Sequence, residues 1–178
     1  SNFSPMETNR RSNGGRCMLN NKWFCEPNPF RETYCFLFLD VIKTEKQNII
    51  KGWKLAIGNI NEFTTQKKCD LRSENKILKD LISEIFYCIK NDLIIITDRE
   101  DTIKILRTRL AVNHIQDVNL SKIHIVFLDE CFKKYFSYNT KNELKKWCEF
   151  LSIDILEKKE TELLKSIYQR IKPLIPGE

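Results

Sequence analysis

The sequence contains few residues that break secondary structure and lacks several short motifs of familiar chemistry. Glycine and proline occur five times each in 178 residues, which argues against a turn-rich all-β sandwich. Gly52 and Gly58 are isolated, so no glycine-rich phosphate loop is present. No Ser/His or Cys/His pair falls in a recognisable catalytic motif. Nucleotide-binding loops and triad-type hydrolases are therefore disfavoured.

Histidine, paired cysteines and long apolar runs are also scarce. None of the seven cysteines is in a C-x-x-C spacing, and only His114 and His124 could complement them, so a zinc site would need distant residues. An odd number of cysteines without a signal peptide favours reduced thiols in the cytosol or nucleus. No apolar stretch reaches the roughly 18 residues of a membrane span. We expect an intracellular protein, nuclear or cytoplasmic, without membrane association or a bound cofactor.

What the chain does have suits one folded domain. Hydrophobic residues make up 42%, and the net charge of +6 arises from 30 basic and 24 acidic residues. This mildly basic balance permits nucleic-acid or acidic partners and also fits an ordinary mixed-charge surface. Residues 1–21 are polar and turn-rich, so we predict a flexible N-terminal arm followed by a single domain over residues 22–178.

The first half of this domain has strand patterns followed by a helix. Residues 34–42 form a continuous apolar run, typical of a central strand covered on both faces. Residues 49–57 alternate as a second strand, and a short third strand is expected at about residues 60–65. Ser73 is expected to cap a helix that ends near Lys90.

The second half alternates strands and helices. Strands are predicted at 93–96 and 123–128, and helices at 130–138, 140–150 and 161–174. A further helix after residue 101 has Ile103, Leu106 and Leu110 on one face. Cys35, Cys88 and Cys148 fall in apolar patterns and are expected in the core. The order predicts an α/β fold: an antiparallel meander, then βα units, giving a mixed sheet flanked by helices.

Three local patterns end or follow apolar runs and contain carboxylates: Y-C-F-L-F-L-D at 34–40, L-I-I-I-T-D-R-E-D at 93–101, and L-E-K-K-E-T-E at 156–162. Together with the order of elements, they resemble the ribonuclease-H-like fold of DEDD-type 3′–5′ exonucleases. The resemblance covers about residues 33–172. It implies Asp40, Asp101 and Glu160 as three of the four carboxylates that hold two Mg²⁺ or Mn²⁺ ions in that family.

The resemblance also implies a defect. The first family motif is Asp-x-Glu on one strand, and here the second carboxylate position is Ile42, which cannot bind a metal. The histidine or tyrosine that precedes the last family carboxylate is missing as well. We therefore predict a pseudoenzyme with no catalytic residues and no bound metal, in which Asp40, Ile42, Asp101 and Glu160 are degenerate motif positions. Each remaining carboxylate also has a plain structural interpretation, such as Asp101 in the first turn of a helix.

Two active alternatives remain open from the sequence. One is a working metal-dependent 3′–5′ exonuclease that uses Mg²⁺ or Mn²⁺. The other is a PIN-like nuclease, which also has a strand-terminal Asp and a later acidic pair. The initial β-meander and the residues Val41 and Ile42 disfavour the PIN-like alternative.

A domain without catalysis needs another role, and a basic, aromatic segment suggests one. Lysines and aromatic residues interleave from residue 133 to 146, a mixture that can contact phosphates and stack on bases. The candidate nucleic-acid-binding residues are Lys133, Lys134, Tyr138, Lys145 and Lys146. A solvated helix face is the alternative interpretation of the lysines. We expect a protein-interaction or nucleic-acid-binding scaffold in a nucleic-acid-processing complex, with a protein partner favoured over nucleic acid.

Overall fold

A computed structural model describes residues 32–70, 72–115, 119–138 and 143–176, together with two short strands near the N-terminus. The chain divides into two units, Ser1–Arg31 and Glu32–Glu178. In the first unit β1 (Met18–Leu19) pairs antiparallel with β2 (Lys22–Trp23). The rest of the predicted arm, residues 1–21, lies outside the described residues. The candidate residues all belong to the second unit.

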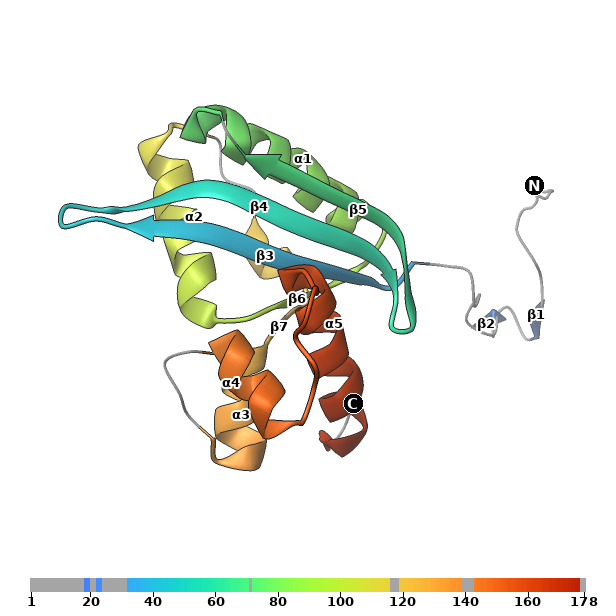
Figure 1. Ribbon diagram of the computed structural model, residues 1–178. Helices are drawn as coiled ribbons and strands as arrows, with labels where there is room; N and C mark the ends of the chain where they lie inside the picture. The colour runs from blue at the N-terminus through green and yellow to red at the C-terminus, as the bar shows by residue number, and fades with distance from the viewer. Residues whose placement is uncertain are drawn as a thin grey trace. The chain divides into compact units, whose positions relative to one another are not determined.

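A five-stranded mixed sheet forms the centre of the second unit (Figure 1). Its order is β5-β4-β3-β6-β7. The first three strands along the chain, β3 (Tyr34–Lys43), β4 (Asn48–Asn59) and β5 (Glu62–Asp70), form an antiparallel meander. β6 (Ile94–Thr97) and β7 (Ile125–Phe127) then add parallel strands beside β3. The predicted α/β fold with a mixed sheet is confirmed.

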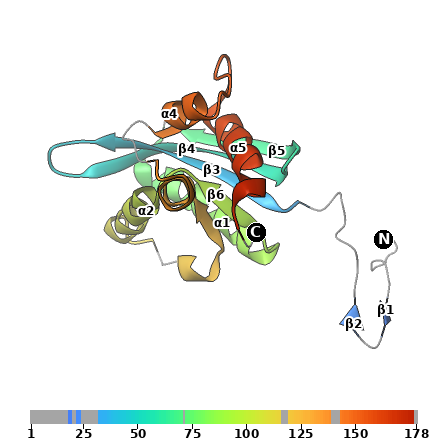
Figure 2. The same cartoon turned by 90° about the horizontal axis from the view of Figure 1, so that it is seen from below.

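Helices cover both faces of this sheet (Figures 1 and 2). α1 (Glu74–Lys90) and α2 (Glu100–Val112) pack on the face that carries Cys35, Leu37 and Leu39. α3 (Leu128–Phe136), α4 (Glu143–Phe150) and α5 (Glu160–Ile171) pack on the opposite face. Because successive strand residues point to opposite faces, a strand buried on both sides must be apolar at nearly every position. This explains the apolar run that begins at residue 34.

Most predicted elements are present, with shifted ends. β5 is longer than predicted because it pairs with β4 along nearly its whole length, from Asn59↔Glu62 to Gly52↔Asp70. Ser73 caps α1 as predicted, and its side chain accepts a hydrogen bond from the backbone N–H of Lys76. The last helix ends at Ile171 and continues as a short 3-10 turn, Lys172–Leu174, which contains Pro173. The predicted start of the 140–150 helix, residues 140–142, lies outside the described residues.

Two further features of the sheet and core bear on the sequence predictions. The sheet requires glycine at position 58, where β4 bulges between Ile57 and Gly58 and an added Cβ would lie 2.5 Å from the backbone oxygen of Glu62.

Cys35, Cys88 and Cys148 are buried free thiols, as predicted, and Cys69 and Cys131 are buried too. A hydrogen bond with Cys88, together with burial, raises the pKa of the Cys35 thiol. These cysteines therefore fill the core as small apolar groups. None of the helices within the described residues is long and apolar enough to cross a membrane.

Candidate functional site

Asp40 lies on β3 at an irregularity in the strand. It pairs with Gly52 of β4, and the register shifts between Asp40 and Val41. β3 does not end at this carboxylate, because the strand resumes its pairing after the bulge and continues to Lys43. The Asp40 side chain is half exposed, and its Oδ2 lies 3.6 Å from the Lys51 Nζ. Ile42, at the second position of the expected motif, is also exposed.

Glu160 is the first residue of α5 and meets the sheet through Lys54. The Lys54 Nζ donates a hydrogen bond to the Glu160 Oε1 at 2.7 Å. Lys54 is directly opposite Phe38 in the β3–β4 register, two residues before Asp40 along β3. Burial alone would raise the pKa of the Glu160 carboxyl, but the hydrogen bond from Lys54 and a backbone hydrogen bond lower it below its usual value. Glu160 is therefore an ionised carboxylate whose positive partner is a lysine.

Asp101 lies in the first turn of α2, where the sequence predicts it. It is exposed on α2, and the next residue, Thr102, is the one that points into the protein. The Thr102 hydroxyl lies 3.4 Å from Asp98 Oδ1. Asp101 instead lines a shallow pocket with Lys46, Gln47 and Lys104, among other residues. Successive residues of an α-helix point about 100° apart, so the side chain at position 101 faces solvent while the side chain at position 102 faces the core.

A second set of acidic residues follows the two parallel strands and was missed in the sequence analysis. Asp98 and Glu100 come after β6, and Asp129 and Glu130 come at the start of α3, directly after β7. The backbone N–H of Asp129 donates to the Asp98 carbonyl oxygen at 2.9 Å, which joins the two segments. Because carboxyl ends of neighbouring parallel strands share one edge, these acids gather there. Their position after two buried runs was the available sequence signal.

Glu100 and Glu130 share a hydrogen bond, and Glu100 also forms an ion pair with Lys104 at 3.2 Å. A hydrogen bond with Glu100, with burial and nearby charges, raises the pKa of Glu130, while the same bond lowers that of Glu100. Burial raises the pKa of Asp129 despite backbone hydrogen bonds to it. Two carboxyl groups that share a hydrogen bond hold one proton more firmly than isolated ones. Within the described ranges, no three His, Cys, Asp or Glu side chains are grouped closely enough to hold a metal ion.

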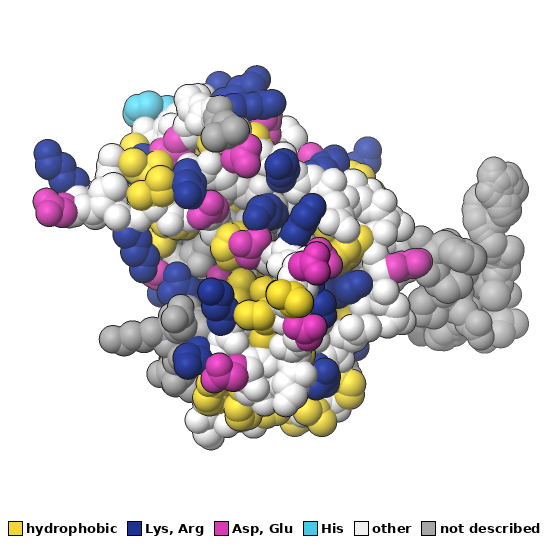
Figure 3. Space-filling model, in the orientation of Figure 1, with side chains coloured by type: hydrophobic (Ala, Val, Ile, Leu, Met, Phe, Trp, Pro, Cys, Tyr) yellow, Lys and Arg dark blue, Asp and Glu magenta, His cyan; other side chains and the backbone are white. Residues whose placement is uncertain are grey.

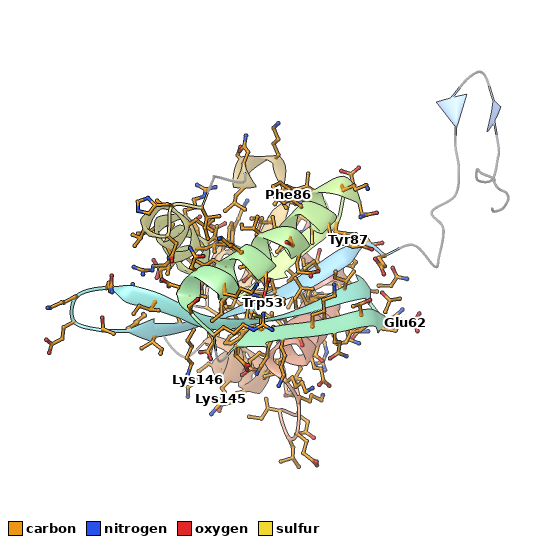
Figure 4. All side chains as sticks on the ribbon, turned by 90° about the horizontal axis from the view of Figure 1, so that it is seen from above. Trp53, Glu62, Phe86, Tyr87, Lys145 and Lys146 are labelled. Atoms are coloured by element: carbon orange, nitrogen blue, oxygen red, sulfur yellow. The ribbon has the colours of Figure 1, made fainter. Side chains whose placement is uncertain are left out.

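The predicted basic surface is split between two helices. Lys133 and Lys134 are exposed near the end of α3, and Lys145 and Lys146 are exposed on α4. Figure 4 shows Lys145 and Lys146 close together, away from α1 and its outward-facing Phe86 and Tyr87. Lys133 lies within electrostatic range of Glu100 and Glu130, and Lys146 Nζ lies 3.7 Å from Glu149 Oε1. Acidic neighbours therefore offset part of this positive charge.

Tyr138 lies in an aromatic cluster on the same side of the molecule. Its ring stacks on Phe150 with centroids 4.5 Å apart and an interplanar angle of 15°. Phe132 stacks in turn on the buried Trp147 at 4.9 Å. Phe150 keeps 48% of its surface exposed and was missed in the sequence analysis. Tyr138 therefore offers one ring face to Phe150 and forms the rim of a core cluster.

Comparison with solved structures identifies the fold. The nuclease domain of 3′hExo, a DEDDh family member bound to rAMP, matches with a TM-score of 0.62 and 10% identity, over 81% of this chain and 92% of that one. A 3′-exonuclease in a structure of 3′-end specific recognition of a histone mRNA stem-loop matches with a TM-score of 0.63 and 10% identity, over 82% and 83% of the chains. A full-length 3′-exonuclease matches with a TM-score of 0.61 and 9% identity, over 82% and 83%.

No family model and no curated protein matches the sequence. The structural likeness nevertheless covers most of each chain, and the strand order agrees with the order of elements expected from the sequence. The described domain therefore has the ribonuclease-H-like fold of DEDD-type 3′–5′ exonuclease domains. At 9–10% identity this likeness establishes the fold and leaves the activity to be argued from the side chains.

Proposed function

We propose that this domain is a non-catalytic exonuclease-like module that serves as a protein-interaction or nucleic-acid-binding scaffold in an intracellular nucleic-acid-processing complex. The observation that carries the proposal is the ion pair between Lys54 and Glu160. Glu160, the carboxylate that the resemblance assigns to the last metal-binding position of the family, has the Lys54 ammonium within hydrogen-bond distance. A cation already occupies one side of this carboxylate.

The other motif positions support the same proposal. Two-metal catalysis needs several carboxylates that converge on two ions about 3.5–4 Å apart. Here Asp40 is half exposed near Lys51, Ile42 is apolar, and Asp101 is exposed on α2. Lysine and isoleucine at these places would leave a metal pair with too little negative charge. The runner-up function, an active Mg²⁺- or Mn²⁺-dependent nuclease, would require these groups to rearrange.

A nuclease assay tests the proposal directly. The purified protein is incubated with 5′-labelled single-stranded RNA and DNA, with Mg²⁺ and separately with Mn²⁺, and the products are resolved by length. We expect the substrates to remain intact. Trimming from the 3′ end that disappears in Asp40→Ala and in Glu160→Ala would establish the active alternative. The variant Lys79→Ala, altered on the exposed side of α1, controls for purification contaminants because it should retain any intrinsic activity.

Nucleic-acid contact is the narrower form of the scaffold proposal. One of the structural neighbours recognises a histone mRNA stem-loop, which supports an RNA contact for this fold. The candidate surface here consists of Lys133, Lys134, Tyr138, Lys145 and Lys146. If it contacts phosphates, affinity should fall steeply with salt, and replacing the four lysines with Glu should abolish binding without unfolding the domain. A matched quadruple change of exposed lysines elsewhere, such as Lys51, Lys76, Lys79 and Lys90, controls for total charge.

The same titration decides between the two kinds of partner. Undetectable affinity at low salt for single and double strands would reject the nucleic-acid form and leave a protein partner as the proposal. A pull-down from cell extract then tests that form. The exposed apolar residues Phe150, Leu156 and Leu174 are the side chains to mutate in it, because exposed apolar surface is typical of protein interfaces.

A further inference from the structure

A pocket of about 370 Å³ lies where the N-terminus of α5 meets strands β4 and β5. Lysine supplies four of its lining residues: Lys54, Lys67, Lys68 and Lys159. The remaining lining residues are Leu55, Gln66 and Thr161. Six of the seven lining residues therefore carry a basic or polar group, around a cavity of the size that small ligands occupy.

The sheet register explains why Lys54, Lys68 and Gln66 converge, whereas Leu55 and Lys67 form the alternate pair on the α1 side of the sheet. Lys54 pairs directly with Lys68, and the neighbouring pair is Ala56 with Gln66. Directly opposed residues of an antiparallel pair point to the same face of the sheet. Phe38, which pairs with Lys54, packs with the α5 side of the core, so Lys54, Lys68 and Gln66 face α5. The pocket lies on the β4–β5 side of Lys54, whereas Asp40 lies on the β3 side.

Only some of the lysines that line the pocket form ion pairs. Lys54 is paired with Glu160, and Lys67 is paired with Glu84 of α1 at 3.0 Å. Among the described residues, no acidic group lies within ion-pair distance of the Lys68 or Lys159 ammonium groups. On the face seen in Figure 3 basic and acidic side chains are interspersed.

Thr161 gives a second and independent indication of a ligand. Its side chain lines the pocket, the residue is 97% buried because only 3% of its surface is exposed, and its hydroxyl has no hydrogen-bond partner among the described residues. Buried polar groups are almost always hydrogen-bonded, and an unpaired buried hydroxyl costs stability. The other buried polar side chains, such as Thr102 and Arg109, have partners. Thr161 therefore has a donor and an acceptor available toward the pocket.

The helix itself adds to this arrangement. Thr161 and Glu162 are in the first turn of α5, where backbone N–H groups lack intrahelical acceptors. The residue before the helix is Lys159, whose ammonium cannot accept a hydrogen bond from the first turn. Its backbone N–H donates to the Glu162 Oε1 at 3.3 Å, and the Glu160 carboxylate accepts a backbone hydrogen bond from its own residue. The N-terminal end of the helix carries partial positive charge, which favours an anion. Lysines, a free hydroxyl and the positive end of a helix thus meet at one place.

We infer that this pocket binds a phosphate group, held by Lys68, Lys159 and the Thr161 hydroxyl, with Lys54 and Gln66 beside it. The phosphate is supplied by a nucleic-acid strand end or by a free mononucleotide. The inference goes beyond the scaffold proposal and does not depend on it, because a phosphate site can exist in either an active or an inactive domain. It is also distinct from the Lys133–Lys146 surface, which lies on α3 and α4.

Calorimetric titration of the full chain tests the inference with four probes: inorganic phosphate, AMP, a 5′-phosphorylated tetranucleotide and the same tetranucleotide without the terminal phosphate. Ionic strength is held constant with chloride. We expect the phosphorylated probes to bind, and the double variant Lys68→Gln, Lys159→Gln to weaken them at least about tenfold, because charge-assisted hydrogen bonds are lost. The matched double variant Lys76→Gln, Lys79→Gln on α1 has the same net charge and should bind as the unchanged protein does.

Thr161→Val separates a binding role from a packing role. Valine keeps the shape and removes the unpaired hydroxyl, so the variant should fold with equal or higher Tm and bind the phosphorylated probes about threefold more weakly. Preference for the phosphorylated tetranucleotide over AMP would assign the source to a strand end, and the reverse to a mononucleotide. Absence of binding, or equal weakening in the pocket variant and its α1 control, would overturn the inference. Neither result bears on the nuclease assay.

Discussion

Two ion pairs on opposite faces of the sheet differ in how far their side chains are exposed to solvent. Glu74 and Arg109, on the α1–α2 side, are nearly enclosed, with side-chain exposures of 13% and 8%. Lys54 and Glu160, on the α5 side, are more than a third exposed, at 39% and 35%. A charge buried in protein must have its hydrogen bonds satisfied there, whereas an exposed one can exchange partners with solvent or a ligand. The first pair is therefore structural, and the second is available for interaction.

The enclosed pair is the centre of a network that joins three parts of the domain. Arg109 donates from Nε and Nη2 to the Glu74 carboxylate and from Nη1 to Gln47 in the β3–β4 turn. Glu74 also accepts from the backbone N–H of Ile50 and the side chain of Asn113. Both carboxylate oxygens are satisfied, which is what makes a buried ion pair tolerable. The network fixes the long hairpin to α1 and α2.

The largest expected effect comes from breaking that network. Arg109→Met should lower the free energy of unfolding by about 3–5 kcal/mol, because it leaves the Glu74 carboxylate buried without its cation. Urea denaturation measures the change. Lys51→Met, which removes only the exposed partner of Asp40, is the control and should change stability by less than about 1 kcal/mol. Similar losses in both variants would contradict the distinction between enclosed and exposed pairs.

Acidification should change the stability contributions of Glu74 and Glu130 in opposite directions. Burial alone would raise the pKa of Glu74, but hydrogen bonds from Arg109, Asn113 and Ile50 lower it below its ordinary value of 4.5. Its stabilising contribution is present above that value and is lost as the pH falls through the lower pKa of the folded state. Glu130 behaves oppositely, because its pKa is raised by Glu100, so its protonation favours the folded state as the pH falls.

Unfolding free energies measured from pH 7 to pH 3 test both signs. Relative to the unchanged protein, Glu74→Gln should show a shallower loss of stability on acidification. Glu130→Gln should show a steeper loss, since it lacks the group that gains stability from protonation. A Glu74→Gln profile parallel to that of the unchanged protein would mean that this carboxylate keeps its ordinary pKa in the folded domain.

The smallest expected effect is at the exposed pair. Lys54→Met should change the free energy of unfolding by about 1 kcal/mol or less, because water screens a pair that is more than a third exposed. Thermal and urea denaturation provide the measurement, with Arg109→Met as the reference for a large loss. A loss as large as that of Arg109→Met would make the Lys54–Glu160 pair a structural element and remove the main support for its functional role.

The sequence predicted the layout better than the direction of individual side chains. The apolar run from Tyr34 and the cap at Ser73 depend on local patterns, so the central strand and α1 were predictable. The bulge at Asp40 depends on pairing with β4, and no local pattern indicated it. Asp101 matched a motif by spacing, yet the helix turns it outward and Thr102 inward. A shift of one position along a helix changes which side chain faces the core.

Contacts between residues far apart in the chain could not be predicted from the sequence for a different reason. Lys54 and Glu160 are separated by 106 positions, and their pairing depends on α5 crossing the sheet at that place. Arg109 did leave a signal, because it interrupts the apolar stripe formed by Ile103, Leu106 and Leu110. A charged residue at a core position implies a buried partner. The identity of that partner, Glu74, required the structure.

Calorimetric titration with Mn²⁺ tests the central claim most directly, since it reports the metal site without requiring a correct substrate. The account predicts no two-site binding in the unchanged protein, and no heat that differs between it and the double variant Asp40→Ala, Glu160→Ala. Binding of two Mn²⁺ ions that is lost in this double variant and retained in Lys79→Ala would contradict the account and favour a metal-dependent nuclease.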